Sequence, residues 1–254
     1  MVMEFASLGC LRTYLHSNFN NITCEKRLKA LVNISMGLKS LHESGLTHHD
    51  FHPGNLLFVK NFGGEFLNIA DLGLCRTVED CKSHKIMGVL PYIAPEVLCK
   101  KKYTKESDVY SFGMVTYEWV TGIPPFYNFQ FDFELASRIV SGLRPKIPEY
   151  IPNFIADLII QCWDGQPEKR PTSEQLTRIL TDWYNEIRIK KESELKKEIA
   201  KYTESAKSFS SDLLRIELYK SKPITFNCLT QINDLKYGNQ NLYSTTQIDL
   251  TIPD

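Results

Sequence analysis

The segment from His48 to Asn55, HHDFHPGN, holds the side chains whose types and spacing are best suited to phosphate chemistry. Phosphoryl transfer needs a carboxylate that orients the attacking hydroxyl and takes its proton, and an oxygen ligand for Mg²⁺ close by. Asp50 and Asn55 supply both groups if the chain turns tightly between them. Pro53 and Gly54 make such a turn plausible.

Two plainer interpretations of this segment remain open from the residues alone. The commonest role of such a sequence is a simple polar turn. His48 and His52 could instead bind zinc, but Pro53 and Gly54 argue against the helix that would align two histidines four residues apart.

A second candidate group is Asp71-Leu72-Gly73. An Asp at the end of a strand can reach magnesium while the glycine lets the backbone turn away. The three residues alone fit a strand-terminating turn equally well. They become stronger evidence for a metal site because of their order along the chain: an acid and an Asn come first, then a hairpin, then Asp-x-Gly. That order would bring two metal ligands together around one triphosphate.

Hydrophobic spacing predicts the elements that position these residues. A helix is expected over residues 25–44, with one buried face and an end at Gly45. Residues 47–55 must then form a loop. The apolar runs Leu56–Val59 and Phe66–Ala70 flank two glycines and predict a β-hairpin.

Further along, residues 74–104 hold few periodic runs and two prolines, so an extended surface segment is expected. Residues 184–207 are helical in character and rich in Lys and Glu; a solvated extension of the preceding helix is favoured over a short coiled coil. The polar residues from about Ser208 predict a weakly ordered tail. Further helices are expected over 106–121, 132–141, 153–163 and from 173, where Thr172 and Gln175 form a capping box.

Composition bounds the possible partners and the compartment. The 254 residues suit one sizeable domain or one and a half, and the net charge of +0 offers no basic field for a nucleic acid or an acidic lipid surface. No membrane span or secretory signal is expected. The seven cysteines are scattered, without a CxxC pair, which favours free thiols in the cytoplasm or the nucleus.

Several motifs in order resemble the eukaryotic protein kinase family. HHDFHPGN corresponds to its catalytic loop H-R-D-x-x-x-x-N, and Asp71–Gly73 to its D-F-G. Its A-P-E is intact at Ala94–Glu96, and Ser107–Gly113 is similar to its central helix. The resemblance covers about residues 1–185, and the ending CW…RPT, at Cys162–Thr172, is most similar to the tyrosine-kinase-like group of Ser/Thr kinases.

The resemblance implies an α+β, mainly α fold: a kinase C-terminal lobe with a small β-hairpin, truncated at the hinge. It also implies transfer of the ATP γ-phosphate to protein hydroxyls, with ATP, Mg²⁺ and a protein substrate as partners, and Ser/Thr favoured over Tyr. The expected divisions are a last N-lobe strand and hinge at 1–9, the C-lobe at 10–185, a charged helical extension at 186–207 and a polar tail at 208–254.

Residue roles follow from the same resemblance. Asp50 would be the catalytic base, with Asn55 and Asp71 holding magnesium. Met3 would be the gatekeeper, the backbone of Glu4 and Ala6 would bond adenine, and Leu57 would form the pocket floor. Two structural roles are also implied: Glu96 pairs with Arg170, and Asp108 accepts hydrogen bonds from the catalytic-loop backbone.

The catalytic region departs from the family pattern at several positions. His49 stands in place of an Arg that gathers a phosphate on the activation segment, so activity is expected to be independent of such phosphorylation. His52 replaces the Lys of Ser/Thr kinases, and Gly54 the Arg of tyrosine kinases. A protonated His52 would partly substitute for that cation, and activity would then fall as pH rises. Val89 replaces a Thr whose hydroxyl would bond Asp50.

The sequence also contains no Gly-rich phosphate loop, no strand Lys for the phosphates and no helix Glu to hold that Lys. Met1 falls in mid-strand, which favours a fragment that is inactive by itself and binds Mg-ATP weakly. A non-catalytic, pseudokinase-type interaction module is the alternative. The H-x-D-x-H-P-G-N loop also resembles aminoglycoside and choline phosphotransferases, which lack the other motifs.

Overall fold

The computed structural model describes residues 6–61, 64–77, 86, 88–100 and 102–209, and two helices run through the middle of this part. Helix α4 (Lys105–Thr121) is buried along almost its whole length. It is buried on every side, as expected for a helix surrounded by others, and its few buried polar residues include Asp108 and Glu118. Thr104 and Ser107 cap its start reciprocally, and Gly122 ends it with φ of 74°.

Helix α2 (Cys24–Glu43) is the second central helix, and it lies against α7 (Ser173–Ile189). The predicted capping box at the start of α7 is confirmed, because Thr172 Oγ1 accepts from Gln175 N at 3.2 Å and Gln175 Oε1 accepts from Thr172 N at 2.8 Å. Helix α6 (Asn153–Cys162) packs on α4.

The predicted hairpin is also confirmed. Strands β2 (Leu56–Asn61) and β3 (Gly64–Ile69) pair antiparallel, with Leu56 opposite Ile69 and Asn61 opposite Gly64. A second two-residue pairing joins β1 (Leu46–Thr47) to β4 (Arg76–Thr77). The mainly helical α+β class expected from the sequence is therefore observed in the described residues.

The expectation of an extended surface segment over residues 74–104 is wrong for the described residues between 86 and 99, whereas residues 74–77 are exposed or half-buried and residues 78–85 lie outside the described part of the chain. A 3₁₀ turn forms at Leu90–Tyr92, followed by helix α3 (Pro95–Lys100), and most described side chains from Ile86 to Cys99 are buried. Apolar contact with the catalytic loop and α4 supplies the burial that the sequence lacks as periodicity. Both prolines stand in the first turns of these elements, where a missing N–H breaks no bond.

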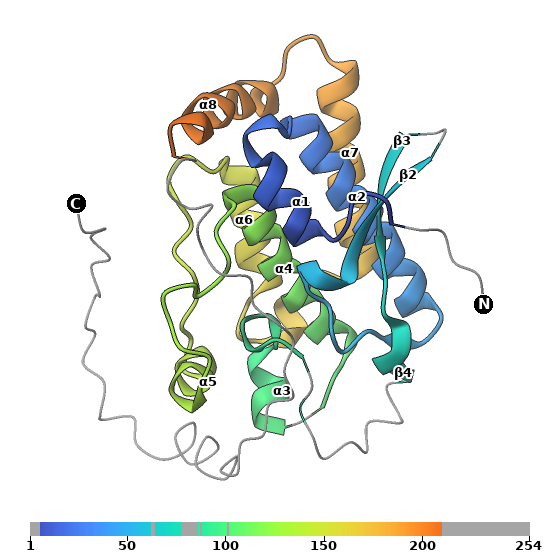
Figure 1. The fold of residues 1–254 in the computed structure, drawn as a ribbon, viewed down its shortest axis with the longest axis vertical. Helices are drawn as coiled ribbons and strands as arrows, with labels where there is room; N and C mark the ends of the chain where they lie inside the picture. Colours follow the sequence, from blue (N-terminus) through green and yellow to red (C-terminus); the bar gives the residue numbers. More distant parts are fainter. Residues whose placement is uncertain (1–5, 62–63, 78–85, 87, 101, 210–254) are drawn as a thin grey trace.

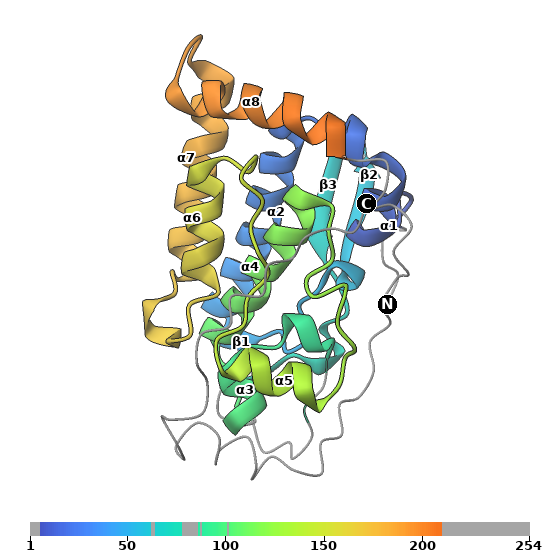
Figure 2. The same ribbon diagram turned by 90° about the vertical axis from the view of Figure 1, so that its left-hand side faces the viewer.

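The expectation that residues 184–207 extend the preceding helix is wrong as well. Helix α7 ends at Ile189, and a separate helix, α8 (Glu194–Phe209), begins after a short turn. It lies across the end of the bundle opposite α3 and α5 (Phe133–Val140) (Figures 1 and 2). Tyr202 of α8 is buried and donates a hydrogen bond to the Val120 carbonyl at 2.7 Å.

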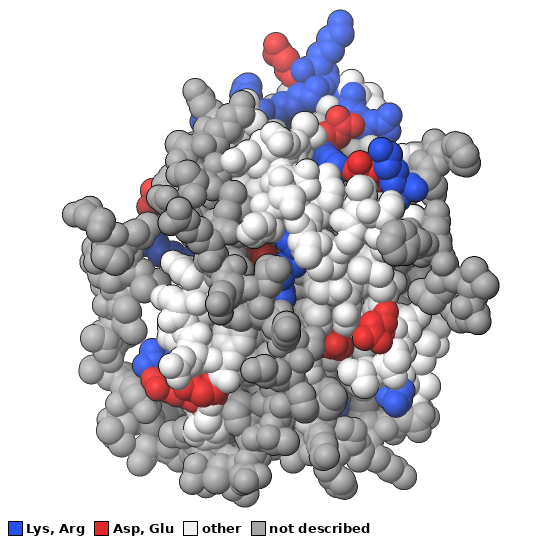
Figure 3. Space-filling model, viewed as in Figure 1, with Lys and Arg blue, Asp and Glu red and all other residues white. Residues whose placement is uncertain are grey.

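The remaining helix, α1 (Leu11–Asn18), was not predicted; it contacts β2. No helix among the described residues is both long and apolar enough to cross a membrane. The end of the molecule where α7 and α8 meet carries Lys and Arg together with Glu, as Figure 3 shows. Lys190 pairs there with Glu186 at 3.0 Å and Lys197 with Glu194 at 3.2 Å.

Candidate active site

The turn between Asp50 and Asn55 brings these two side chains together, as predicted. Pro53–Asn55 form one 3₁₀ turn, which begins at His52. The Asn55 amide nitrogen donates to Asp50 Oδ2 at 3.0 Å and to the Asp50 carbonyl at 2.9 Å. Because both of these atoms are acceptors, Nδ2 must face them, and Asn55 Oδ1 remains an acceptor for another group.

The Asp50 carboxylate is buried and asymmetrically bound. Its Oδ2 is held by Asn55, whereas Oδ1 lies 3.3 Å from His52 Nε2, a long contact that does not reach full hydrogen-bond geometry with any described residue. Burial would raise the pKa of Asp50, but interactions with His52, Asn55 and His48 outweigh burial, so its pKa lies below the usual value. The carboxylate is thus ionised near neutral pH.

Asp108, at the start of α4, holds the backbone of the catalytic loop in the predicted way. Its Oδ2 accepts from His48 N at 2.8 Å and its Oδ1 from His49 N at 3.3 Å. His42 Nε2 lies 3.0 Å from the same Oδ2. These bonds support a strained turn, since His49 has φ of 70°, a value uncommon outside glycine.

Asp71 is placed beside the loop through its neighbour Ala70. The Ala70 N–H donates to the Asn55 carbonyl at 2.8 Å, and the Ala70 carbonyl lies 3.1 Å from His48 Nε2. Asp71 itself adopts a left-handed conformation with φ of 56°, and its Oδ1 accepts from Gly73 N at 3.4 Å. Asp71 is exposed, and it directly follows Ala70, whose backbone bond joins this strand end to Asn55.

Of the residues expected to contact adenine, Ala6 and Leu57 are described, while Met3 and Glu4 lie outside the described residues. The Ala6 carbonyl accepts from Gly9 N at 3.1 Å, and the Gly9 carbonyl accepts from Phe58 N at 2.9 Å. The segment that follows Ala6 therefore lies along β2 beside Leu57.

His49 occupies the position where the family pattern has a phosphate-gathering Arg. Its ring stacks on Tyr103 with centroids 4.2 Å apart, and its Nε2 lies 2.7 Å from Thr47 Oγ1. Burial lowers the pKa of His49. The imidazole is therefore packed into the protein and neutral near pH 7.

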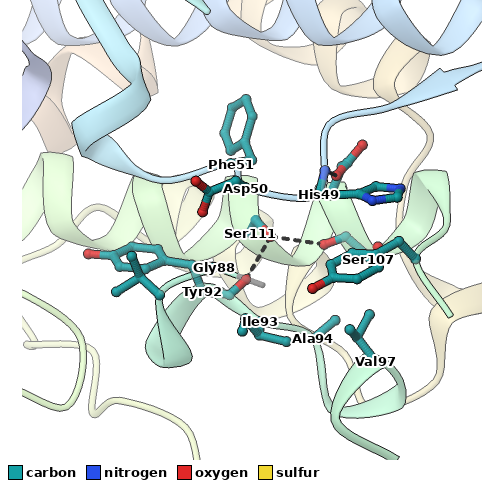
Figure 4. A pocket seen from close by; sticks show the side chains of 13 residues that line it. His49, Asp50, Phe51, Gly88, Tyr92, Ile93, Ala94, Val97, Ser107 and Ser111 are labelled. Carbon is teal, nitrogen blue, oxygen red and sulfur yellow. Dashed lines mark hydrogen bonds between the residues drawn. The ribbon is translucent and has the colours of Figure 1, made fainter. Parts of the chain in front are cut away.

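The catalytic loop meets the segment Gly88–Val97 almost without a gap. Figure 4 shows Asp50, Gly88 and Tyr92 among the residues that line a cavity at this contact. The cavity has a volume of about 10 Å³, room for about one water. Val89 lines the same cavity, so an apolar side chain stands where the family pattern has a hydroxyl. A Cβ at Gly88 would lie 3.3 Å from Asp50 Oδ1, so glycine leaves room beside the carboxylate.

Two buried clusters anchor this segment to the helices. The predicted pair of Glu96 with Arg170 is confirmed as a bidentate contact, with N–O distances of 2.7 and 2.8 Å. The second cluster was not predicted. Arg12 Nη2 donates to the Tyr92 hydroxyl at 3.0 Å, Arg12 Nε lies 3.3 Å from Glu118 Oε1, and the Tyr92 hydroxyl donates to Glu118 Oε2.

The described residues fit a magnesium nucleotide in the chemistry of their donors. Asn55 Oδ1 and the Asp71 carboxylate are hard oxygen ligands of the kind that Mg²⁺ prefers, and the bond from Ala70 N to the Asn55 carbonyl joins the two chain segments that carry them. No cluster of three or more His, Cys, Asp or Glu suited to a metal occurs among the described residues, and the zinc interpretation gains no support. His48 instead accepts from Asp50 N at 3.2 Å through Nδ1.

Comparison with known proteins gives the family. The model of the family "Protein tyrosine and serine/threonine kinase" matches residues 1–180. R831 of Acanthamoeba polyphaga mimivirus, named as a serine/threonine-protein kinase/receptor, is 36% identical over 182 residues, covering 71% of this chain and 11% of that protein. The serine/threonine-protein kinase STY17 of Arabidopsis thaliana is 30% identical over 189 residues, 74% of this chain and 32% of that protein.

The chain thus spans about a tenth to a third of the length of these curated relatives. The family match covers the catalytic loop, the Asp71 turn, the segment anchored by Glu96 and the central helix α4. It ends before α8. The chain belongs to the protein tyrosine and serine/threonine kinase family.

Proposed function

We propose that this chain carries the catalytic lobe of a protein kinase of the tyrosine-kinase-like group, which transfers the ATP γ-phosphate to Ser or Thr hydroxyls of a protein substrate. The observation that carries the proposal is the Asp50 carboxylate. It is buried and ionised, it is held through one oxygen by Asn55, and its other oxygen lacks a full hydrogen bond among the described residues.

Each residue has a specific task in this reaction. Asp50 Oδ1 accepts a hydrogen bond from the substrate hydroxyl, orients it and takes its proton as the phosphate bond forms. Asn55 keeps the carboxylate oriented through Nδ2, while its Oδ1 and the Asp71 carboxylate would hold Mg²⁺. When bound, Mg²⁺ neutralises charge on the transferred phosphate. Ala6 and Leu57 would line the adenine site, together with Met3 and Glu4.

The divisions of the chain and its compartment belong to the same proposal. In this proposal residues 10–185 are the C-lobe and 1–9 would be the last strand and hinge of the N-lobe, of which residues 1–5 lie outside the described part of the chain. Residues 186–207 form a charged extension, which contains most of α8. The tail at 208–254 lies almost wholly outside the described residues. The cysteines described are all free thiols, and we place the protein in the cytoplasm or the nucleus.

A non-catalytic interaction module is the second candidate. Val89 favours it, because it stands beside Asp50 without the hydroxyl of the family pattern. In that case the helical surfaces would bind partners and Asp50 would do no chemistry.

An assay of Asp50→Asn tests the two candidates against each other. The protein is prepared as the 254-residue chain and as the longest in-frame product that contains it. Transfer of labelled γ-phosphate to a Ser/Thr substrate should be lower in the variant by about 10²- to 10⁴-fold. Asp157→Asn is the matched control, since Asp157 is exposed on α6. Equal transfer by wild type and Asp50→Asn would contradict the kinase assignment.

Nucleotide binding adds a second measurement. The 254-residue chain should show no rise in melting temperature with Mg-ATP, because the sequence has no Gly-rich loop or strand Lys to clamp the phosphates. A clear rise that depends on ATP would contradict that expectation. A rise confined to the longer product would support the proposed role of a complete lobe pair.

A further inference from the structure

The two nitrogens of His52 have different and assignable roles. The backbone N–H of Gly54 points at His52 Nδ1, with an N–N distance of 3.0 Å. A backbone amide can only donate, so Nδ1 must present its lone pair. The proton of the neutral ring is therefore on Nε2, the nitrogen that faces Asp50.

The proton-bearing nitrogen of His52 lies near Oδ1 of Asp50, the carboxylate oxygen that Asn55 does not bond. His52 Nε2 lies 3.3 Å from Asp50 Oδ1, and Asn55 Nδ2 lies 3.0 Å from Oδ2. Both side chains of the His52–Asp50 pair are buried. The contact does not reach full hydrogen-bond geometry in this structure, and catalytic contacts often tighten only when substrate binds. The loop thus places one N–H donor near each carboxylate oxygen of Asp50: Asn55 Nδ2 at Oδ2 and His52 Nε2 at Oδ1.

Gly54 is required for the imidazole to take this position. A Cβ at residue 54 would lie 2.7 Å from His52 Cε1 and 2.9 Å from Nδ1. The ring therefore rests directly on the Gly54 backbone. On another side it lies near the Tyr92 ring, with centroids 6.1 Å apart. Tyr92 is itself held by the buried Arg12 and Glu118.

This geometry differs from the role expected for His52 as a cation at the γ-phosphate. A second proton would have to sit on Nδ1, where it would meet the Gly54 N–H and break that hydrogen bond. The nitrogen that carries the proton, Nε2, lies 3.3 Å from Asp50 Oδ1. The observed contacts thus favour a neutral donor within the loop over a charge presented to the nucleotide.

We propose that His52 is a positioning residue for Asp50: Gly54 fixes its Nε2–H tautomer, and the Nε2–H group orients the Asp50 carboxylate toward the substrate hydroxyl. The inference rests on the proposed kinase function. It assigns to His52 and Gly54 together the orientation of Asp50, a task different from that of the cation at the γ-phosphate in the family pattern. The hydrogen-bond donor is Nε2–H of the His52 ring, which lies against the Gly54 backbone.

Two amide variants separate the two hydrogen bonds of the ring. In His52→Gln the amide nitrogen can occupy the place of Nε2, so the donor to Asp50 is kept. In His52→Asn the amide oxygen can occupy the place of Nδ1, so the bond from Gly54 is kept and the donor to Asp50 is lost. In the longest in-frame product that contains the chain, we expect kcat of His52→Asn to be lower than that of His52→Gln by about 10-fold or more, with KM for ATP alike in both.

Gly54→Ala tests the same unit from the other side, because it keeps the imidazole but removes the space in which the ring rests. Its kcat should fall as that of His52→Asn does. Equal kcat in His52→Asn and His52→Gln would overturn the proposal, since the donor to Asp50 would then have no effect. A higher kcat for His52→Asn would do so as well.

A measurement without activity keeps the inference separable from the kinase assignment. ¹⁵N NMR of the folded 254-residue chain reports the tautomer of each histidine. We expect the Nε2–H form for His52 and a shift of that proton's resonance in Asp50→Asn. The buried His42, which faces Asp108 instead, should be unaffected and serves as the internal control. An Nδ1–H tautomer for His52 would overturn the proposal, even in an active protein. An Nε2–H tautomer in a protein that transfers no phosphate would uphold the positioning contact and contradict the kinase assignment.

Discussion

The segment Gly88–Lys100 is fastened to the helical core by two buried charge clusters of different construction. Near its end, Glu96 meets Arg170 in a two-residue, bidentate contact. At its middle, the Tyr92 hydroxyl stands between Arg12 and Glu118, so a neutral group joins two charged ones. The first cluster is a single ion pair, and the second is a network of three side chains.

The difference shows in how each charge is satisfied. Arg170 also donates to the Glu106 and Asp164 carbonyls, at 2.8 and 2.9 Å, so four of its five N–H donors are bonded to neighbours. In the other cluster, burial raises the pKa of Tyr92, and the nearby Glu118 raises it further. Its hydroxyl therefore keeps its proton and can serve the network only as a neutral bridge.

We infer that the two clusters serve different ends. The Glu96–Arg170 pair joins the C-terminal part of the segment to the helical core. If either residue is lost, the charge of the other is left without an ion-pair partner. The Tyr92 network ties the middle of the segment, close to His52, where Arg12 and Glu118 still contact each other directly if the bridge is lost. Substitutions should therefore have larger effects in the first cluster than in the second.

The largest effect is expected for Arg170→Met. Removing the guanidinium leaves Glu96 and two carbonyls without their donor, and breaking a buried pair costs about 3–5 kcal/mol of unfolding free energy. Urea unfolding followed by circular dichroism measures the loss. Arg178→Met, on the exposed face of α7, is the control and should change stability by less than about 0.5 kcal/mol. A loss below about 1 kcal/mol for Arg170→Met would mean that the Glu96–Arg170 pair is not the main contact that holds the segment to the helical core.

A smaller effect is expected for Tyr92→Phe. The variant keeps the ring beside His52 but removes the hydroxyl that bonds Arg12 and Glu118, and hydrogen bonds to charged groups contribute about 1.5–3 kcal/mol each. The direct contact of Arg12 with Glu118 should hold the loss near the lower value. The same unfolding measurement applies, with the more exposed Tyr127→Phe as the control. A loss as large as that of Arg170→Met would abolish the distinction between the clusters.

Local sequence signals predicted the parts of the fold that depend on neighbours along the chain. The hairpin, α2, α4 and the capping box at Thr172 follow from spacing and from turn and cap residues within a few positions. Motifs predicted the Glu96–Arg170 pair and the bonds of Asp108, because each partner stands in its own recognisable pattern.

Features that depend on distant partners were not predicted. Arg12 and Tyr92 carry no local sign of their contact, which joins residues 80 positions apart. Helix α8 turns back because Tyr202 finds the Val120 carbonyl, 82 positions earlier, and its Lys/Glu-rich sequence suggested only a solvated face. The direction of the His52 ring depends on one backbone N–H, that of Gly54, and on the absence of a Cβ there. The roles of Asp50, Asn55 and Asp71 remain predictions.

The smallest effect is expected for Ser111→Ala, which tests whether the backbone of Tyr92 contributes separately from its hydroxyl. Ser111 Oγ donates to the Tyr92 carbonyl at 2.6 Å and lies 3.1 Å from the Ser107 carbonyl, so it joins the 3₁₀ turn to α4 (Figure 4). Losing this hydroxyl should cost about 0.5–1.5 kcal/mol of unfolding free energy.

Ser137→Ala is a closely matched control, since Ser137 Oγ is buried and has no hydrogen-bond partner among the described residues. Its removal should leave stability unchanged or slightly higher, because an unsatisfied hydroxyl is lost from the interior. In the double variant Ser111→Ala, Tyr92→Phe, the two losses should add if hydroxyl and backbone anchor the turn independently. A combined loss below the sum would show that the network and the carbonyl bond are one anchor, and the segment would then have two fastenings instead of three.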